Sequence, residues 1–221
     1  MPKVKLPRKS TNIDMTAMCD VAFLLLSFFM LATKFKPDEP VQVSTPSSVS
    51  DIPLPDTSIM LITIDQAGRT FFAIDNKNKR KELIENMNEY KNLGLTDDEM
   101  NSFAIGSSLG VPLRQLKSYL ASTPDDQRAF DAAAPGIPLD TAITEANELA
   151  HWIRSARVVN GKLRICIKAD SKTPYPEIQR IVKTLGGLDI FKFNLITALE
   201  GVPEGSALAR IQLEEANAKS K

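Results

Sequence analysis

The chain has 221 residues, with 27 basic and 27 acidic side chains and a formal net charge of zero. Such a chain lacks the excess of basic residues expected of a general nucleic-acid binder, so we expect no nucleic acid among its partners. Its two cysteines, Cys19 and Cys166, lie far apart and are not expected to pair, so the fold must depend on its own apolar core.

The first predicted element is the apolar stretch Met15–Phe35, which we expect to form a transmembrane helix after a short tail at residues 1–14. Within Val21–Ala32 the only polar side chain is Ser27. At about 1.5 Å per residue, Met15–Thr33 extends over roughly 28 Å, close to the ~30 Å hydrocarbon core of a bilayer. The sequence therefore predicts one membrane crossing.

Asp20 lies inside this span, where insertion of an acidic residue at a helix centre costs about 3 kcal/mol. An apolar setting disfavours the charged carboxylate, so Asp20 is expected to hold a proton there and to release it on meeting water or a polar partner. Moving one charge across ~100 mV is worth about 2.3 kcal/mol, which is similar to that cost, so a proton gradient can switch the carboxyl between its two states. Thr16 and Ser27 fall on the same helix face and are candidate supporting hydroxyls.

Two other interpretations stay open from this helix alone. In the first, Asp20 lies at the level of the head groups and the true span begins at Val21, so that the carboxylate has no special role. In the second, the segment is a cleaved signal peptide, although no A-x-A-like cleavage site comes after it. Cys19 precedes the apolar run instead of following it, which argues against a lipoprotein cysteine.

The stretch Asn12–Met30, NIDMTAMCDVAFLLLSFFM, resembles the membrane helix of the ExbD/TolR family. That family has an acidic residue shortly after a Met/Val-Thr-Pro-like start, followed by an apolar run that ends in Phe-Met; Ala17 stands where proline is frequent. The resemblance implies that Asp20 is the proton-responsive residue. It also implies a non-enzymatic subunit, without cofactors, of a motor in the inner membrane that is driven by the proton motive force.

The same resemblance implies partners: a ring of ExbB/TolQ-like multi-span subunits, a TonB-like protein that serves outer-membrane transport, and a second copy of the chain in a homodimer. A TolR-like role in Tol-Pal envelope maintenance is the alternative within the family. Outside the family, the alternative is a signal-anchored periplasmic binding module. In that case an unrelated anchor in place of residues 15–35 would leave activity intact.

The residues that flank the span predict its orientation. Four Lys/Arg residues lie within the first nine positions, against Lys34 and Lys36 after the span, so we expect a cytoplasmic N-terminus and a periplasmic remainder. Residues 36–57 contain five prolines and a Ser/Thr cluster. They are expected to be an extended periplasmic linker with a reach of some 60 Å.

Residues 58–200 are predicted to form an α+β domain with helices packed on one face of a β-sheet. The expected elements are a hairpin of Ser58–Asp65 and Thr70–Asp75, a helix at Ala142–Arg157 capped by Asp140 or Thr141, a strand at Leu163–Ala169, a helix at Tyr175–Leu185 ended by Gly186 and Gly187, and a strand at Phe191–Leu199. Ile165–Tyr175 and Phe193–Thr197 resemble the periplasmic domain of the ExbD/TolR family, in which a strand ends in Ala-Asp and a Pro-Tyr opens the next helix.

Residues 76–139 are interpreted as an insertion at the sheet edge, with a tail at 201–221 after the domain. The insertion is expected to hold a charged turn at Lys77–Arg80, a helix at Glu82–Asn92, a short helix around Leu113, Leu116 and Leu120, and a loop at Ser122–Gly136. Gly106–Gly110 is only a weak match to a phosphate loop, because it lacks the Gly-Lys-Ser/Thr ending.

Two further residues invite a functional interpretation. Asp170 is expected to be a turn and cap residue and not a catalytic group, because no histidine, cysteine or second carboxylate accompanies it in the sequence. His151, the single histidine, is interpreted as a partly exposed packing residue, with pH sensing as the alternative.

Overall fold

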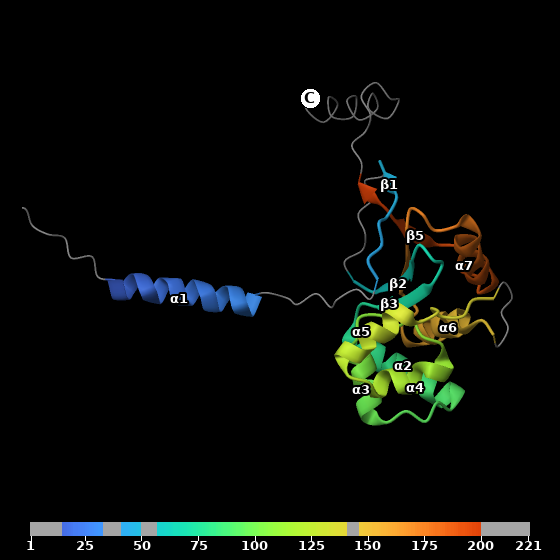
Figure 1. Ribbon diagram of the computed structural model, residues 1–221, viewed down its shortest axis with the longest axis horizontal. Coiled ribbons are helices and arrows are strands. Elements are labelled where there is room, and N and C mark those ends of the chain that lie inside the picture. Colours follow the sequence, from blue (N-terminus) through green and yellow to red (C-terminus); the bar gives the residue numbers. More distant parts are fainter. Residues whose placement is uncertain (1–14, 33–40, 50–56, 141–145, 200–221) are drawn as a thin grey trace, which may run out of the picture. The chain divides into compact units, whose positions relative to one another are not determined.

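The computed structural model describes residues 15–32, 41–49, 57–140 and 146–199. The chain divides into two compact units, residues 1–37 and residues 38–221. Among the described residues, the first unit contains helix α1 (Met15–Ala32), and the second contains a β-sheet with its helices (Figure 1). The predicted class, an α+β fold with one N-terminal apolar helix, is confirmed. The predicted tails at 1–14 and 201–221 lie outside the described residues.

A four-stranded mixed sheet forms the centre of the second unit, with the strand order β3-β2-β4-β5. Strand β2 (Ile59–Ile64) runs antiparallel to β3 (Thr70–Ile74) and parallel to β4 (Arg164–Ala169). Strand β5 (Phe193–Ile196) runs parallel to β4. The parallel pairs require crossover connections, and helices in the intervening sequence provide them.

The β2–β3 hairpin has the predicted short connection. The backbone N–H of Asp65 donates to the Arg69 carbonyl at 3.1 Å, and Gly68 has a φ of 82°, which glycine adopts without a steric penalty. The Asp65 carboxylate also accepts the Arg69 backbone N–H at 2.8 Å. The turn is therefore closed by backbone and side-chain hydrogen bonds together.

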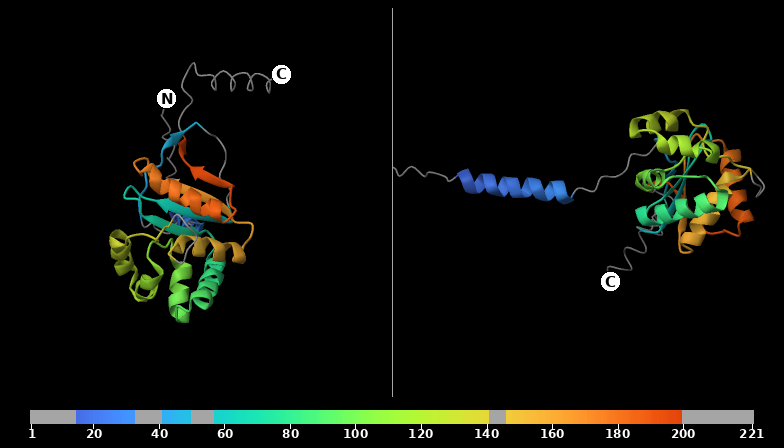
Figure 2. Two further views of the ribbon diagram at one scale, coloured as in Figure 1. Left: turned by 90° about the vertical axis from the view of Figure 1, so that its right-hand side faces the viewer. Right: turned by 90° about the horizontal axis from the view of Figure 1, so that it is seen from below.

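The core lies on one face of this sheet, beneath α6 (Glu148–Val159) and α7 (Tyr175–Gly187), which cover the same side of the strands (Figure 2). Trp152 of α6 is fully buried, with its ring centroid 5.9 Å from that of Phe72 on β3 and 5.7 Å from that of Phe103. The sheet supplies the other wall of the core through fully buried aliphatic side chains at alternate positions: Met60, Ile62, Ile64 and Ile167.

In the sequence, four helices lie between β3 and α6: α2 (Lys77–Lys91), α3 (Asp97–Ile105), α4 (Leu113–Ala121) and α5 (Pro124–Ala133). The α3–α4 loop pairs with the edge strand, because Leu109 and Phe72 exchange two backbone hydrogen bonds of 2.8 Å each. This loop satisfies backbone groups of an edge strand that would otherwise need another partner.

The predicted charged turn at residues 77–80 is wrong, because these residues form the first turn of α2. The Asn76 side chain accepts the backbone N–H groups of Asn78 and Lys79 and so caps the helix one turn earlier than its apolar pattern suggests. The helix ends at Lys91, and Asn92 adopts a left-handed conformation with φ 50°.

The predicted loop at residues 122–136 is also wrong, since it contains α5. Thr123 caps α5 by accepting the N–H of Asp126 at 3.4 Å, and a proline stands in the first turn, where its missing N–H is tolerated. Helix α3, which was not predicted, begins with a capping box in which Thr96 and Glu99 each accept the backbone N–H of the other. The predicted short helix at residues 113–120 is confirmed as α4.

Helix α6 begins later than predicted. Its cap is Asn147, whose side chain accepts the Ala150 N–H at 3.1 Å, and not Asp140 or Thr141. Residues 141–145, which include the predicted start, lie outside the described residues. The Asn147 amide also donates to the Asp140 carbonyl at 2.7 Å. This one side chain therefore caps α6 and also forms a hydrogen bond with the backbone of Asp140.

The C-terminal elements match the predicted types, with shifted ends. Helix α7 continues through Gly186 and Gly187, and the predicted strand at residues 191–199 is divided into β5 and β6 (Ala198–Leu199). Strand β6 pairs with β1 (Ser47–Ser48) and not with the main sheet. Within the described part of the predicted linker, Ser47 and Ser48 therefore form a short strand that pairs with the domain.

Candidate functional site

Helix α1 is the first candidate site. It contains neither glycine nor proline, and none of its 18 residues is buried. At about 1.5 Å per residue it extends over roughly 27 Å, enough for one crossing of a bilayer. Among the described residues it is the one helix with the length and composition of a membrane span. Residues 33–35, the end of the predicted span, lie outside the described residues.

Asp20 is the only charged side chain on α1. Thr16 precedes it by one turn and Ser27 follows it by about two turns, so the three residues share one helix face. Along the axis Ser27 lies about 10 Å from Asp20, beyond hydrogen-bonding distance within one chain. The Ser27 hydroxyl donates instead to the Leu24 carbonyl at 2.9 Å. The face is therefore a polar stripe and not a compact cluster.

The position of Asp20 along α1 is asymmetric. It lies about 8 Å from the first residue of the helix and about 18 Å from the last, measured along the axis. No described residue forms a hydrogen bond or ion pair with its carboxylate. Any polar partner of this carboxylate in an assembled complex would therefore have to come from outside the described residues of the chain.

In the second unit, Asp170 is a turn residue, as predicted. Its carboxylate accepts the N–H of Lys172 at 2.9 Å and that of Ser44 at 3.0 Å, and these two bonds lower the pKa of Asp170. The predicted capping role is wrong, because α7 begins after Pro174 without a side-chain cap. Asp170 thus joins the end of β4 to the segment before β1.

The predicted partial exposure of His151 is wrong. The residue is 4% exposed on α6, with its ring centroid 5.9 Å from that of Tyr90. The Lys91 ammonium lies 3.4 Å from its Nε2. His151 therefore packs between α6 and α2 and does not face solvent.

The loop Gly106–Gly110 is not a phosphate cradle. Its Gly106 and Leu109 amide groups already donate to the backbone carbonyls of Ser102 and Phe72. A Cβ at Gly110 would lie 2.2 Å from the Phe71 ring, so this glycine provides space for an aromatic side chain. The start of the following helix is also occupied, because the Leu113 N–H donates to the Glu148 carboxylate at 2.7 Å.

Sequence reasoning missed a polar network that joins the hairpin to α4 and α5. Arg69 forms an ion pair with Asp65, with 2.6 Å between Nε and Oδ2, and donates to the Ala132 carbonyl at 2.8 Å. The Tyr119 hydroxyl donates to Asp131 at 3.2 Å. Burial raises the pKa of Asp131 to about 6, while this hydrogen bond and the charge of Arg69 act in the opposite direction. Asp65 and Arg69 are four positions apart, but no spacing in the sequence connects them to Tyr119 or Asp131.

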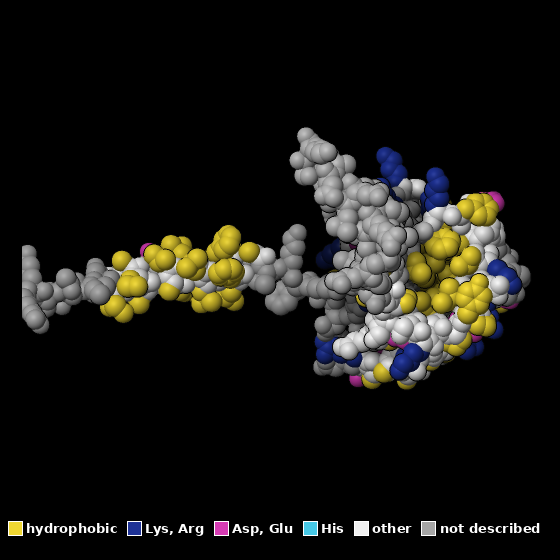
Figure 3. Space-filling model, turned by 90° about the horizontal axis from the view of Figure 1, so that it is seen from above, with side chains coloured by type: hydrophobic (Ala, Val, Ile, Leu, Met, Phe, Trp, Pro, Cys, Tyr) yellow, Lys and Arg dark blue, Asp and Glu magenta, His cyan; other side chains and the backbone are white. Residues whose placement is uncertain are grey.

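A surface formed by α7 and β5 carries exposed apolar side chains, which appear as the yellow area on the right of the domain in Figure 3. Tyr175 is 71% exposed and Leu195 50%, and Val182 and Phe193 are also exposed. Strand β5 ends the main sheet, so one of its edges is unpaired among the described strands. Exposed apolar side chains beside an open strand edge are typical of a protein–protein contact.

Comparison with protein families matches residues 7–200 to the model described as biopolymer transport protein ExbD/TolR. Neither the curated proteins nor the solved structures include a match to the chain. Members of the matched family are non-enzymatic accessory proteins of transport complexes in membranes, and α1 has the length and composition of a single membrane span. With nearly its whole length matched, this chain belongs to the ExbD/TolR family of biopolymer transport proteins.

Proposed function

We propose that the chain is a subunit of an inner-membrane motor of the ExbB–ExbD type, driven by the proton motive force, and that Asp20 is its proton-responsive residue. The observation that carries the proposal is the single carboxylate on an otherwise uncharged helix that is long enough to span a membrane. Keeping an acid in such a helix costs about 3 kcal/mol, so the residue is expected to have a function.

The partner of α1 is proposed to be a ring of ExbB/TolQ-like multi-span subunits. None of the residues of α1 is buried, and no described residue forms a hydrogen bond with the Asp20 carboxylate. A surrounding ring would supply polar groups or water to the stripe of Asp20 and Thr16. Proton transfer to and from the carboxylate would then change which ring positions the helix prefers.

The second unit is proposed to lie in the periplasm, with the N-terminus in the cytoplasm, and to pass the movement of α1 to a TonB-like protein. Residues 36–57 connect α1 to the sheet, and their described part pairs with the domain through β1. The apolar surface of α7 and β5 is proposed as the contact for a second copy of the chain or for the TonB-like protein.

Replacement of Asp20 tests this function. In the native complex, Asp20→Asn keeps the size and polarity of the side chain but cannot ionise, so we expect transport driven by outer-membrane receptors to fall at least about 100-fold, within the range of effects seen for essential proton carriers. Asp20→Glu keeps an ionisable carboxyl and is expected to retain part of the activity. The measurement is uptake of a siderophore or vitamin by cells that carry only the variant at native abundance.

Two controls make the result specific. Ser27→Ala removes a hydroxyl from the same face without touching the carboxyl, and it is expected to have a much smaller effect than Asp20→Asn. Sensitivity of the same cells to detergent reports envelope integrity, so loss of integrity without loss of uptake would assign the chain to the TolR-like role. Normal uptake and normal integrity in the Asp20→Asn strain would exclude the proton-responsive role.

A further inference from the structure

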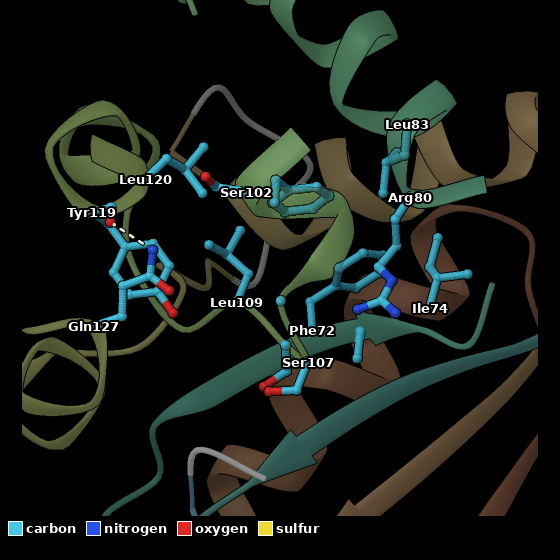
Figure 4. Close-up of a pocket in the computed structure, with 14 residues that line it drawn as sticks. Phe72, Ile74, Arg80, Leu83, Ser102, Ser107, Leu109, Tyr119, Leu120 and Gln127 are labelled. Atoms are coloured by element: carbon cyan, nitrogen blue, oxygen red, sulfur yellow. Dashed lines mark hydrogen bonds between the residues drawn. The ribbon is translucent and has the colours of Figure 1, made fainter. Parts of the chain in front are cut away.

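The narrow pocket beside Phe72 is part of the core of the second unit. Figure 4 shows Phe72, Leu83 and Leu109 around it, from β3, α2 and the α3–α4 loop. Its space open to water amounts to about 20 Å³, which is room for about one water molecule. This pocket therefore accommodates no larger ligand.

An open groove lies where strands β4 and β5 begin. About 670 Å³ of it is open to water, far more than in the pocket of Figure 4. Ile165 pairs with Phe193 in the parallel β4–β5 ladder. Arg164 and Lys192 each stand one position earlier, so they lie next to each other at this edge of the sheet. The turn between α6 and β4 forms another wall of the groove and brings in Lys162.

The charged side chains of this region are almost all basic. The groove is lined by four basic residues and no acidic residue: Arg157, Lys162, Arg164 and Lys192. An adjoining hollow shares Arg157 and adds Arg154 and the acidic Asp189. We call the five basic residues of the two hollows the basic surface. In a chain whose formal charges sum to zero, this surface is a local excess of positive charge.

The described part of the chain does not neutralise the basic surface. None of its five side chains forms an ion pair with a described residue. Arg157 donates through Nη1 to the Gly161 carbonyl at 3.0 Å, which holds the α6–β4 turn. The other four side chains are exposed and form no hydrogen bond with described residues. Their charges can therefore pair with an anionic partner outside the chain.

An exposed aromatic side chain lies among these charges. Phe191 lines the groove, directly precedes Lys192 and is 75% exposed. Basic side chains beside an exposed aromatic ring are typical of a surface that binds a lipid bilayer, because the cations attract anionic head groups and the ring enters the boundary between head groups and acyl chains. A purely ionic partner would leave this ring in water, whereas a lipid surface would bury it.

The chain is long enough to bring the basic surface to a bilayer crossed by α1. Residues 33–43 separate the end of α1 from Ser44, whose backbone N–H donates to the Asp170 carboxylate. Fully extended, these residues span about 40 Å. Asp170 follows the end of β4, and the basic surface lies at the start of this strand, about 20 Å away along its axis. The connection therefore exceeds the distance that it must cover.

We propose that the basic surface and Phe191 bind the anionic phospholipid head groups of the membrane that α1 crosses. This inference rests on the proposed membrane crossing by α1. Each basic side chain near an anionic lipid surface strengthens binding about fivefold. Because the chain connects the domain to the membrane, the lipid is present at a high effective concentration, and weak contacts are sufficient for binding.

The first experiment measures whether residue 191 contacts lipid. The full-length Phe191→Trp protein is reconstituted into liposomes with brominated acyl chains, which quench tryptophan fluorescence on contact. We expect quenching in liposomes that contain phosphatidylglycerol to be at least about twofold stronger than in liposomes of phosphatidylcholine alone. Ile105→Trp is the matched control, because Ile105 is 65% exposed and lies on α3, outside the basic surface. Fully buried Trp152 gives both variants the same background.

Two results of this experiment would overturn the proposal. The first is equal quenching of the Phe191→Trp protein in the two kinds of liposome, which would show that anionic head groups do not attract the domain. The second is equal quenching of the Phe191→Trp and Ile105→Trp proteins, which would show that the contact with lipid is not specific to the basic surface.

The second experiment removes charge from the basic surface of the Phe191→Trp protein. The double substitution Lys162→Gln and Lys192→Gln is expected to lower the ratio of lipid-bound to unbound domain about tenfold or more. The matched control is Lys77→Gln with Lys81→Gln, which removes the same charge from exposed lysines of α2. We expect no change in the control. Unchanged quenching after loss of Lys162 and Lys192, or an equal loss in the control, contradicts the assignment.

A flotation assay separates this proposal from the membrane crossing by α1. In about 1 M salt, surface charges are screened, so flotation of the protein with liposomes reports α1 alone. Flotation without quenching would overturn binding by the basic surface and leave the crossing by α1 intact, whereas loss of flotation would overturn both. Soluble poly-glutamate represents an acidic polymer as the alternative partner. We expect it to leave quenching unchanged, and loss of quenching at micromolar poly-glutamate would overturn the proposal in favour of that partner.

Discussion

Asp20 and Asp131 are carboxylates from the two units of the chain, and their surroundings differ. Asp131 is 7% exposed, yet the second unit supplies the Tyr119 hydroxyl as a donor at 3.2 Å and the charge of Arg69 nearby. Asp20 lies on a helix with no buried residue, and no described residue pairs with it. The surroundings of Asp131 are thus set inside its own domain, where burial opposes its charge, whereas the proposed partners of Asp20 lie in other subunits.

Because of this difference, we expect substitutions in the two units to affect different properties of the protein. Changes in the second unit should alter its folding free energy, because the contacts that they remove are internal. Changes at Asp20 should alter the work of the assembled complex, because the contacts that matter are made with other subunits. Three substitutions in the second unit test the contacts within that unit.

The largest effect on stability is expected from Gly110→Ala. The added Cβ would lie 2.2 Å from the Phe71 ring, which is 1% exposed, so the buried aromatic side chain must move. Overpacking of this kind destabilises by about 2–3 kcal/mol. Chemical denaturation monitored by Trp152 fluorescence measures the change. Gly186→Ala is the matched control, because its Cβ meets nothing within 4 Å and lies in helix α7, where alanine stabilises by up to about 1 kcal/mol.

A second effect, which depends on pH, is expected from Asp131→Asn. Because the folded-state pKa of Asp131 is raised to about 6 from 3.8, the folded state binds the proton more tightly than the unfolded state. The wild-type protein should therefore lose stability as pH rises from about 4 to about 6, by at most roughly 3 kcal/mol, and then level off. The variant cannot ionise and lacks this loss. Unfolding free energies of both proteins at pH 4 and pH 8 test the prediction, and parallel pH profiles would refute it.

The smallest effect is expected from Asp170→Asn at the exposed turn after β4. The lowered pKa of Asp170 means that its stabilising bonds are present above the usual carboxyl pKa and are lost as pH falls through the lowered value. The variant should show faster amide hydrogen exchange at Ser44 and Lys172 at neutral pH, and the difference from wild type should vanish in acid. Faster exchange throughout β4 would show instead that the turn supports the whole strand.

The parts of the fold that were predictable from the sequence are those with a strong local pattern. Strands β2 and β3 coincide with runs of β-branched and aromatic residues around Gly68, and α1 coincides with an uninterrupted apolar stretch. Helix ends were harder to predict from the sequence, because short capping side chains determine where a helix begins. Asn76 and Asn147 shift the starts of α2 and α6, and neither cap is distinguishable in sequence from an ordinary polar residue.

The candidate sites differ in the same way. Asp20 was visible in the sequence, since a carboxylate in an apolar stretch is a local anomaly. The network of Arg69 and Asp131 was not, because it depends on contacts between residues far apart in the chain.

The proposed function depends most on whether Asp20 gains and loses a proton in the working complex. Infrared difference spectroscopy of the purified complex in liposomes, with and without an imposed proton gradient, measures this directly. We predict a carboxyl band that changes with the gradient in the wild-type complex and is absent from the Asp20→Asn complex. A spectrum in which both complexes respond identically would contradict the proton-responsive role of Asp20.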